Sequence, residues 1–142
     1  MYTARCAWLV GDGPALDTLG SALARHHCIV ERIAPDAVDG WMSRVRAGDA
    51  AVVPNLIILT DAIAFKDGGA PLEVLAARPP WRLLPVVVVT TADDPTHCRA
   101  AYAAGASSWV VVDPADATDE IGEAFARYWL DTALLPEAIL PG

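Results

Sequence analysis

Hydrophobic residues are concentrated in five short runs along the chain, and between them apolar residues recur every three or four positions. The runs are continuous rather than alternating, as Leu56–Leu59 and Val86–Val89 show. A continuous run of this length predicts a strand buried on both faces, and a spacing of three or four predicts an amphipathic helix. The predicted strands cover residues 6–10, 27–33, 56–59, 86–89 and 109–112.

Glycine, proline and aspartate mark the boundaries between these elements. Gly11-Asp12-Gly13-Pro14 ends the first strand, and Asp93-Asp94-Pro95 opens the helix after the fourth. The last helix is predicted over residues 116–133. The alternation predicts an α/β fold of (βα)5 type, a parallel sheet with helices on both faces. We expect one domain over residues 1–133 and a C-terminal tail over 134–142 that trails off the last helix.

The composition limits the partners and the cell compartment that we expect for this chain. The chain has 142 residues, 54% of them hydrophobic, and a net charge of −8. This charge argues against nucleic acid and anionic membranes as partners, and no apolar run approaches the ~20 residues of a membrane span. Three widely spaced cysteines predict neither a disulfide framework nor a zinc site. With no signal peptide pattern at the N-terminus, we expect a cytoplasmic protein.

The chemistry-bearing residues follow the predicted strands. In an open parallel sheet, binding sites form at the carboxyl ends of the strands, near the point where strand order reverses. In this chain those ends carry Asp12, Thr60, Asp61 and Thr90, followed by Val112-Asp113 after the fifth strand. We therefore expect these side chains to lie at one edge of the sheet.

Several segments, in order and at matching spacing, resemble the receiver domain of two-component response regulators over nearly the whole chain. The ending Tyr128–Pro136 resembles one subgroup, the single-domain regulators that accompany bacterial phytochromes. The resemblance implies a flavodoxin-like sheet of order 2-1-3-4-5. The other matching segments are Trp8–Pro14, Pro54–Leu59, Pro85–Thr91 and Gly105–Val111.

The resemblance also implies a chemistry. A receiver domain takes a phosphoryl group from a histidine kinase onto an aspartate after the third strand. Two acids after the first strand help that aspartate to hold Mg²⁺, which neutralises the phosphoryl oxygens. A hydroxyl after the fourth strand and a lysine after the fifth contact the phosphoryl group.

Residue by residue, this chain keeps only part of that set. Gly11 and Asp12 stand where the family has two acids, and Thr90 matches the hydroxyl. Counting from Pro54, the phosphoacceptor position is Thr60, and Asp67-Gly68 downstream supports this register. The lysine position is Val112. Asp61 lies one residue beyond the phosphoacceptor position, which in a strand places it on the opposite face.

These departures predict a degenerate, stand-alone receiver domain that is not an enzyme and acts by protein–protein interaction. Its expected partners are a sensor histidine kinase or another signalling protein, and a second copy of itself. The alternative is a working phosphoacceptor that uses Asp61, with Asp12 toward Mg²⁺ and Thr90 on the phosphoryl group. Otherwise we expect no cofactor and no metal, with Asp12 alone a weak candidate ligand. A small enzyme or ligand-binding protein on the same fold is the third interpretation.

The last helix and the fifth strand supply the candidate homodimer interface. A core stripe is predicted at Ile121, Ala124, Phe125, Tyr128 and Trp129. A second apolar line, Ala126, Leu130 and Leu134 at steps of four, runs beside Trp129. A helix with two apolar faces usually contacts a second partner. Trp109 stands where receivers have a switch aromatic residue, and it faces either the core or the interface. A tail that folds back over the second line is the other explanation. The candidate interface residues are Trp109, Ala126, Trp129, Leu130 and Leu134.

Overall fold

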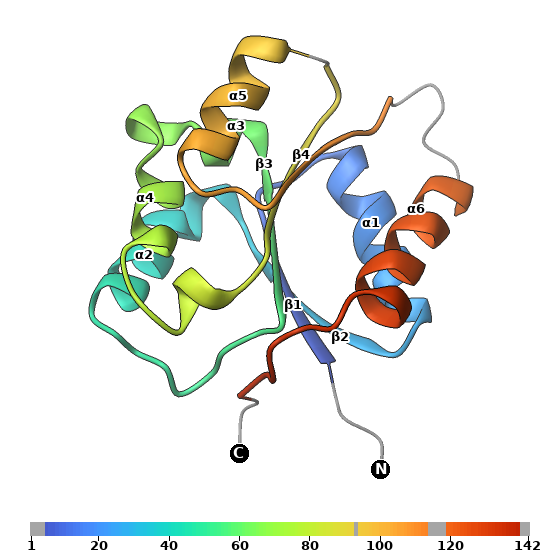
Figure 1. The fold of residues 1–142 in the computed structure, drawn as a ribbon, viewed down its shortest axis with the longest axis horizontal. Coiled ribbons are helices and arrows are strands. Elements are labelled where there is room, and N and C mark those ends of the chain that lie inside the picture. Colours follow the sequence, from blue (N-terminus) through green and yellow to red (C-terminus); the bar gives the residue numbers. More distant parts are fainter. Residues whose placement is uncertain (1–4, 93, 114–118, 140–142) are drawn as a thin grey trace.

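The computed structural model describes residues 5–92, 94–113 and 119–139. Five parallel strands form one sheet in the order β2-β1-β3-β4-β5 (Figure 1). This order confirms the predicted α/β fold, with its reversal at β1 and β3. The strands are β1 (Arg5–Val10), β2 (Cys28–Ile33), β3 (Leu56–Thr60), β4 (Val86–Thr90) and β5 (Ser108–Val111).

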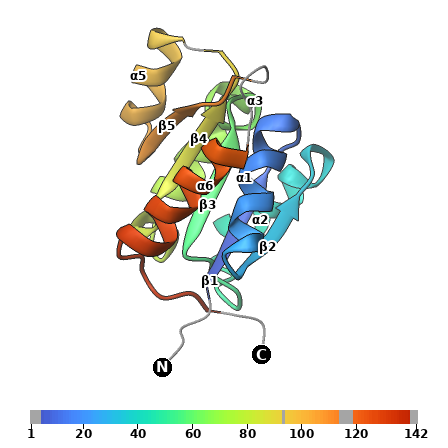
Figure 2. The ribbon, with the colours of Figure 1, turned by 90° about the vertical axis from the view of Figure 1, so that its right-hand side faces the viewer.

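Helices cover both faces of the sheet. The helices α1 and α6 lie on one face, and α2, α4 and α5 lie on the other (Figures 1 and 2). No helix in the described ranges is both long and apolar enough to cross a membrane. The helices are α1 (Pro14–Arg25), α2 (Val38–Arg46), α3 (Asp61–Ala64), α4 (Ala70–Ala76), α5 (Pro95–Ala103) and α6 (Asp119–Ala126), with short 3-10 turns η1 (Pro35–Ala37), η2 (Lys66–Gly68) and η3 (Trp81–Leu83) and a π-helical turn η4 (Arg127–Thr132).

Successive strand residues enter two different cores. In β1, Trp8 and Val10 belong to the cluster under α2 and α4, whereas Ala7 and Leu9 belong to the cluster under α1 and α6. The alternation follows from the strand period of two, and both sets are apolar because both faces are covered. This confirms the interpretation of the continuous apolar runs.

A short helix follows β3 directly, where the sequence pattern predicted no element. α3 begins at Asp61, directly after the strand, and the side chain of Thr60 accepts a hydrogen bond from the backbone N–H of Ile63. An extended residue whose hydroxyl accepts from the third residue on is a helix N-cap. The chain therefore turns helical one residue after Thr60, and this changes the direction of the Asp61 side chain.

The predicted stripe on the last helix is partly wrong. Phe125 and Trp129 are buried as expected, but Ala124 and Tyr128 are exposed. Residues of the supposed second line, Ala126 and Leu130, are 0% and 6% exposed inside the chain's own core. The helix widens to π-type geometry from Arg127, which shifts the phase of the residues that follow. Residues 116–118 of the predicted helix, and Pro114, lie outside the described residues.

The beginning of the C-terminal tail crosses the end of the sheet at which the strands begin (Figure 1). It neither trails away from the domain nor folds back over α6. The backbone of Ile139 exchanges two hydrogen bonds of 2.7 Å with Val53, in the loop before β3. The buried Asn55 side chain donates to the carbonyl of Pro136 at 2.6 Å and accepts from the N–H of Cys6 at 2.7 Å. The tail is thus joined to β1 and to the loop that leads into β3, while Leu134 stays fully exposed.

Candidate functional site

The carboxyl ends of β1, β3 and β4 surround a cavity of about 180 Å³. Its position matches the expectation from strand order, because β1 and β3 are the strands at which the order reverses. Four of the predicted site residues line it, and the fifth, Val112, does not. The lining residues include Asp12, Thr60, Asp61 and Thr90, together with Gly13, Pro14, Ala15, Ala62, Val89 and Thr91.

The β1 side of the cavity contributes a single carboxylate. Asp12 is exposed and follows Gly11, whose φ of +124° is a backbone conformation that favours glycine. A Cβ on Gly11 would lie 2.5 Å from Oγ1 of Thr60. The Thr60 side chain therefore occupies the space in which a second acid at position 11 would begin. The residue before α1 is Gly13, without a side-chain cap, so Asp12 lies in the turn and does not cap the helix.

The structure corrects the expected direction of Asp61. If β3 continued through Asp61, a shift of one position from Thr60 would place this side chain on the opposite face of the sheet. β3 ends at Thr60, however, and Asp61 is the first residue of α3. Its side chain turns toward β4 and lines the same cavity as Asp12.

The hydroxyl of Thr90 holds the Asp61 carboxylate. Oγ1 of Thr90 donates to Oδ2 of Asp61 at 2.8 Å, and the backbone N–H of Ala62 donates to Oδ1 at 2.9 Å. Thr90 itself is 2% exposed, and its hydroxyl accepts from the N–H of Ala92 at 3.2 Å. Both oxygens of Asp61 are thus oriented by donors from two different segments. This pairing links the predicted hydroxyl with the alternative candidate for the phosphoacceptor.

Val112, the residue predicted at the lysine position, belongs to the apolar core. Val112 is 0% exposed and packs in the cluster under α1 and α6, and its N–H donates to the carbonyl of Thr90 at 2.8 Å. The single lysine of the chain, Lys66, lies 3.8 Å from Asp39 and from Asp67 and does not line the cavity. Within the lining no cationic side chain is available to neutralise a phosphoryl group.

The donor set does not fit a tight Mg²⁺ site. Mg²⁺ prefers near-octahedral oxygen coordination and is usually bound by carboxylates together with waters or phosphate oxygens. Among the described residues, no cluster of three or more His, Cys, Asp or Glu side chains is suited to a metal ion.

Trp109 is half-buried on the edge strand rather than part of the core. Its ring centroid lies 6.3 Å from that of Phe65, which in turn lies 4.9 Å from that of His97. Its backbone N–H donates to the hydroxyl of Tyr102 at 3.2 Å. The side chain therefore connects β5 with the end of α3 and with α5.

The chain is similar in structure to response regulators. The phosphorylated cyanobacterial phytochrome response regulator RcpA matches with a TM-score of 0.76 at 22% identity, over 95% of this chain and 100% of that chain. The response regulator RPA3017, from red light signaling of R. palustris, matches with a TM-score of 0.64 at 22% identity. This match covers 92% of this chain and 97% of that chain. A response regulator from Hahella chejuensis matches with a TM-score of 0.71 at 22% identity, over 90% of this chain and 96% of that chain.

No protein-family model and no curated protein sequence matches the chain. The class that these findings define is a fold: the chain has the five-stranded receiver fold of two-component response regulators. Within this class, two of the similar structures named above are regulators of phytochrome or red-light signalling.

Proposed function

We propose that this chain is an atypical receiver-type domain in two-component signalling that acts by protein–protein contact. The observation that carries the proposal is the pair of departures at the site, Thr60 and Val112, within an otherwise complete receiver fold. A threonine at the phosphoacceptor position offers no carboxylate to form an acyl phosphate. A fully buried valine at the lysine position offers no charge to stabilise one.

A sensor histidine kinase is the proposed partner. A chain of receiver fold that lacks the phosphoacceptor would compete with phosphorylated receivers for such a kinase. The likeness to phytochrome and red-light regulators supports a light-sensing kinase as the one to test first.

A second candidate function rests on the hydrogen bond between Thr90 and Asp61. In this alternative an oxygen of Asp61 attacks the phosphorus of a donor and an acyl phosphate forms on Asp61. The bond that breaks joins phosphorus to the imidazole nitrogen of a kinase histidine, or to the acetate oxygen of acetyl phosphate, and the donor leaves with that electron pair. The Thr90 hydroxyl, already 2.8 Å from Oδ2, would then donate to a phosphoryl oxygen. The absent lysine and second acid are the reasons to rank this function below protein–protein contact.

Intact-mass measurement distinguishes the two functions. The wild-type chain and the Asp61→Asn variant are incubated with acetyl phosphate, with and without Mg²⁺, beside the exposed matched control Asp67→Asn. We expect no gain of one phosphoryl mass in any sample. A gain in wild type and Asp67→Asn that is absent from Asp61→Asn establishes the phosphoacceptor function instead.

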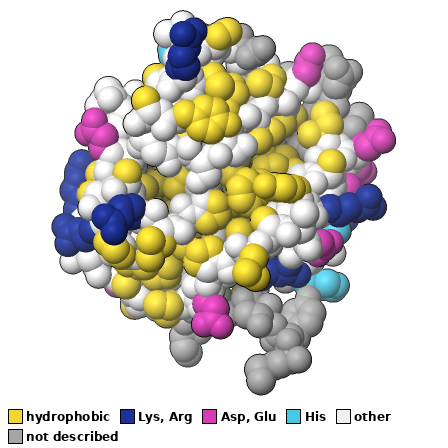
Figure 3. All heavy atoms as spheres, viewed as in Figure 1, with side chains coloured by type: hydrophobic (Ala, Val, Ile, Leu, Met, Phe, Trp, Pro, Cys, Tyr) yellow, Lys and Arg dark blue, Asp and Glu magenta, His cyan; other side chains and the backbone are white. Residues whose placement is uncertain are grey.

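Homodimer formation is the second part of the proposal. β5 is an edge strand, and hydrophobic side chains gather over it between α5 and α6 (Figure 3). Of the exposed apolar residues there, Tyr102 and Val111 are 49% and 42% exposed. Such a patch beside a strand with one unpaired edge favours a second copy of the chain.

Sedimentation velocity tests the dimer. We expect wild type to sediment as a dimer and Val111→Asp as a monomer. Ile29→Asp, at an equally exposed site on the opposite edge strand β2, is the matched control and should remain dimeric. A monomeric wild type at tens of micromolar contradicts this part of the proposal.

A further inference from the structure

Three arginines gather where α2 and α4 end, on the face of the sheet opposite α1 and α6. Arg46 is the last residue of α2, and Arg78 follows the end of α4 by two residues. Nη1 of Arg78 lies 3.7 Å from the position of a Cβ on Gly48, which is two residues beyond Arg46. Arg82 comes one turn later, and its N–H donates to the carbonyl of Arg78 at 3.1 Å. Figure 3 shows Lys and Arg side chains along the edge of the molecule where α2 and α4 lie.

The charges of these three arginines are not used within the described part of the chain. All three side chains are exposed, and none forms an ion pair or a side-chain hydrogen bond with another described residue. Arg25 and Arg32, by contrast, pair with carboxylates at 3.0 and 2.8 Å. The negative ends of the two helices favour arginine at positions 46 and 78, but Arg82 lies on η3. The helix dipoles therefore do not account for the whole cluster.

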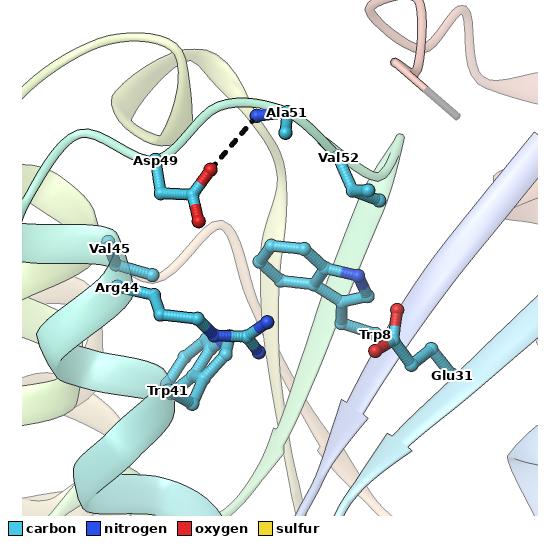
Figure 4. A pocket seen from close by; sticks show the side chains of 8 residues that line it. All are labelled: Trp8, Glu31, Trp41, Arg44, Val45, Asp49, Ala51 and Val52. Carbon is cyan, nitrogen blue, oxygen red and sulfur yellow. Dashed lines mark hydrogen bonds between the residues drawn. The ribbon is translucent and has the colours of Figure 1, made fainter. Parts of the chain in front are cut away.

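Acidic side chains mark the border of this cluster on one side. A cavity of about 240 Å³ opens there between the end of α2, the strands β1 and β2, and the loop before β3 (Figure 4). It is bordered by Trp8 and Trp41, and its lining includes Arg44 together with the carboxylates of Glu31 and Asp49. These two acids balance the charge of Arg44, so the unbalanced positive charge lies on the three arginines beyond it.

Apolar groups lie beside the arginines on the other side. Leu83, next to Arg82, is 63% exposed. A hollow of about 180 Å³ opens between α4, η3 and the start of β4, and the exposed residues of its lining are Ala76, Arg82 and Gly105. The rest of the lining is apolar, which suits a large apolar side chain.

From these features we propose that this basic surface, made of Arg46, Arg78, Arg82 and Leu83, binds an acidic segment of a partner protein. Guanidinium groups donate to carboxylates in bidentate, charge-assisted pairs. The exposed leucine and the adjacent hollow favour a segment in which a large apolar side chain stands among the acids. The surface is separate from the strand-end cavity and from β5, so the inference goes beyond the proposed function.

The charge of the rest of the molecule favours a short peptide segment over nucleic acid or an anionic membrane. The chain carries a net charge of −8, and the unbalanced positive charge is confined to a few side chains. A nucleic acid or a bilayer extends beyond them and meets the surrounding acids, which repel it. A short acidic segment contacts the basic surface alone.

Fluorescence anisotropy of a short labelled peptide, with glutamates around one leucine, tests the proposal. We expect saturable binding at low salt that weakens by about tenfold or more at ~0.5 M NaCl. The same peptide with glutamine in place of glutamate should bind more weakly by a similar factor. Absence of saturable binding of the glutamate peptide up to about millimolar concentration overturns the proposal, as does equal binding of the glutamine peptide. Tighter binding of a single-stranded oligonucleotide or of phosphatidylserine vesicles also overturns it.

Two double variants and one single variant locate the binding. Arg46→Gln/Arg78→Gln should weaken the glutamate peptide by about tenfold, and Leu83→Ser by about threefold. Arg99→Gln/Arg127→Gln removes the same charge from exposed arginines on α5 and η4, and should keep the affinity within about twofold of wild type. Equal weakening by the two double variants shows that net charge alone acts and overturns the assignment. An unchanged affinity of Leu83→Ser contradicts the apolar contact.

Discussion

The contact between Gly11 and Thr60 shows how two departures from the receiver pattern depend on each other. A Cβ at position 11 would meet both Oγ1 and Cγ2 of Thr60, at 2.5 and 2.8 Å. The branched side chain of Thr60, at the predicted phosphoacceptor position, and the missing side chain of Gly11 therefore form one packing unit. Restoring the second acid alone would create a clash and a strained backbone at φ +124°.

Gly11→Ala should lower the free energy of unfolding by about 2–4 kcal/mol, the sum of overpacking and left-handed strain. Urea denaturation measures the change. Gly13→Ala is the control, because Gly13 has φ +110° but nothing within 4 Å of a Cβ, so only the strain should appear. Thr60→Ala alone removes the α3 N-cap, so it is the reference for the double variant Gly11→Ala/Thr60→Ala, in which adding Gly11→Ala should cost no more than Gly13→Ala does. Equal losses in the two single variants would refute the packing argument.

The side chain of Asn55 forms hydrogen bonds with backbone groups of two other segments of the chain. Asn55→Ala leaves the buried N–H of Cys6 without its acceptor and frees the tail at Pro136. We expect a loss of about 1–3 kcal/mol in the free energy of unfolding, measured by urea denaturation. The control is Glu137→Ala, which changes an exposed residue of the tail. Its free energy of unfolding should stay within about 0.5 kcal/mol of the wild-type value. A neutral Asn55→Ala would show that the tail is not held by this side chain.

At the scale of elements, the close approach of α6 to α1 decides which residues of the last helix are buried. A Cβ on Gly122 would lie 2.9 Å from Cβ of Ala22 and 3.0 Å from the carbonyl oxygen of Thr18. This glycine lets the helices approach, and the approach buries Ala126 beside them. Helical periodicity alone could not show this, because it does not reveal which neighbour is near or where the helix widens.

Gly122→Ala should therefore destabilise the fold by about 1–3 kcal/mol through overpacking. Gly40→Ala is the matched change in another helix, where a Cβ meets nothing within 4 Å. That substitution should stabilise the fold by about 0.5–1 kcal/mol, because alanine loses less backbone freedom on folding. Thermal unfolding of both variants measures the contrast, and a stabilising Gly122→Ala would contradict the packing account.

A charge contact also joins α1 to α6. Glu123 accepts from His26 at 2.6 Å and from Arg25 at 3.0 Å. Hydrogen bonds from His26, and then from Arg25, lower the pKa of the Glu123 carboxyl below its ordinary 4.5. Because the folded pKa is below the unfolded one, this stabilisation is present above the unfolded pKa and is lost as pH falls through the folded value.

Glu123→Gln should consequently destabilise the protein at pH 7 and lose most of that effect near pH 3. Chemical denaturation at the two pH values measures the difference. Glu120→Gln, an exposed acid on the same helix, is the control and should show no comparable change with pH. An effect of Glu123→Gln that is equal at both pH values would exclude the charge contact as its cause.

For the molecule as a whole, the sheet places two cavities at opposite ends of β3. The cavity lined by Asp12, Thr60 and Asp61 forms where strand order reverses, and the cavity bordered by Trp8 and Trp41 forms beside the end of α2 and the loop before β3. The first was predictable from the strand-end residues. The second was not, because Trp8 and Trp41 lie on segments far apart in the sequence, and only the packing of α2 and the loop before β3 against β1 brings them to one cavity.

The sequence by itself determined the fold class, the strand order expected from the resemblance, and the residues at the strand ends. Continuous apolar runs carry this information because burial on both faces is a local requirement of each strand. Only the tertiary structure decided that Asp61 turns to Thr90, that Ala126 and Leu130 are buried, and that the tail crosses beneath the sheet. Each of these depends on a neighbour remote in sequence, and a one-residue difference in where a strand ends reverses the direction of a side chain.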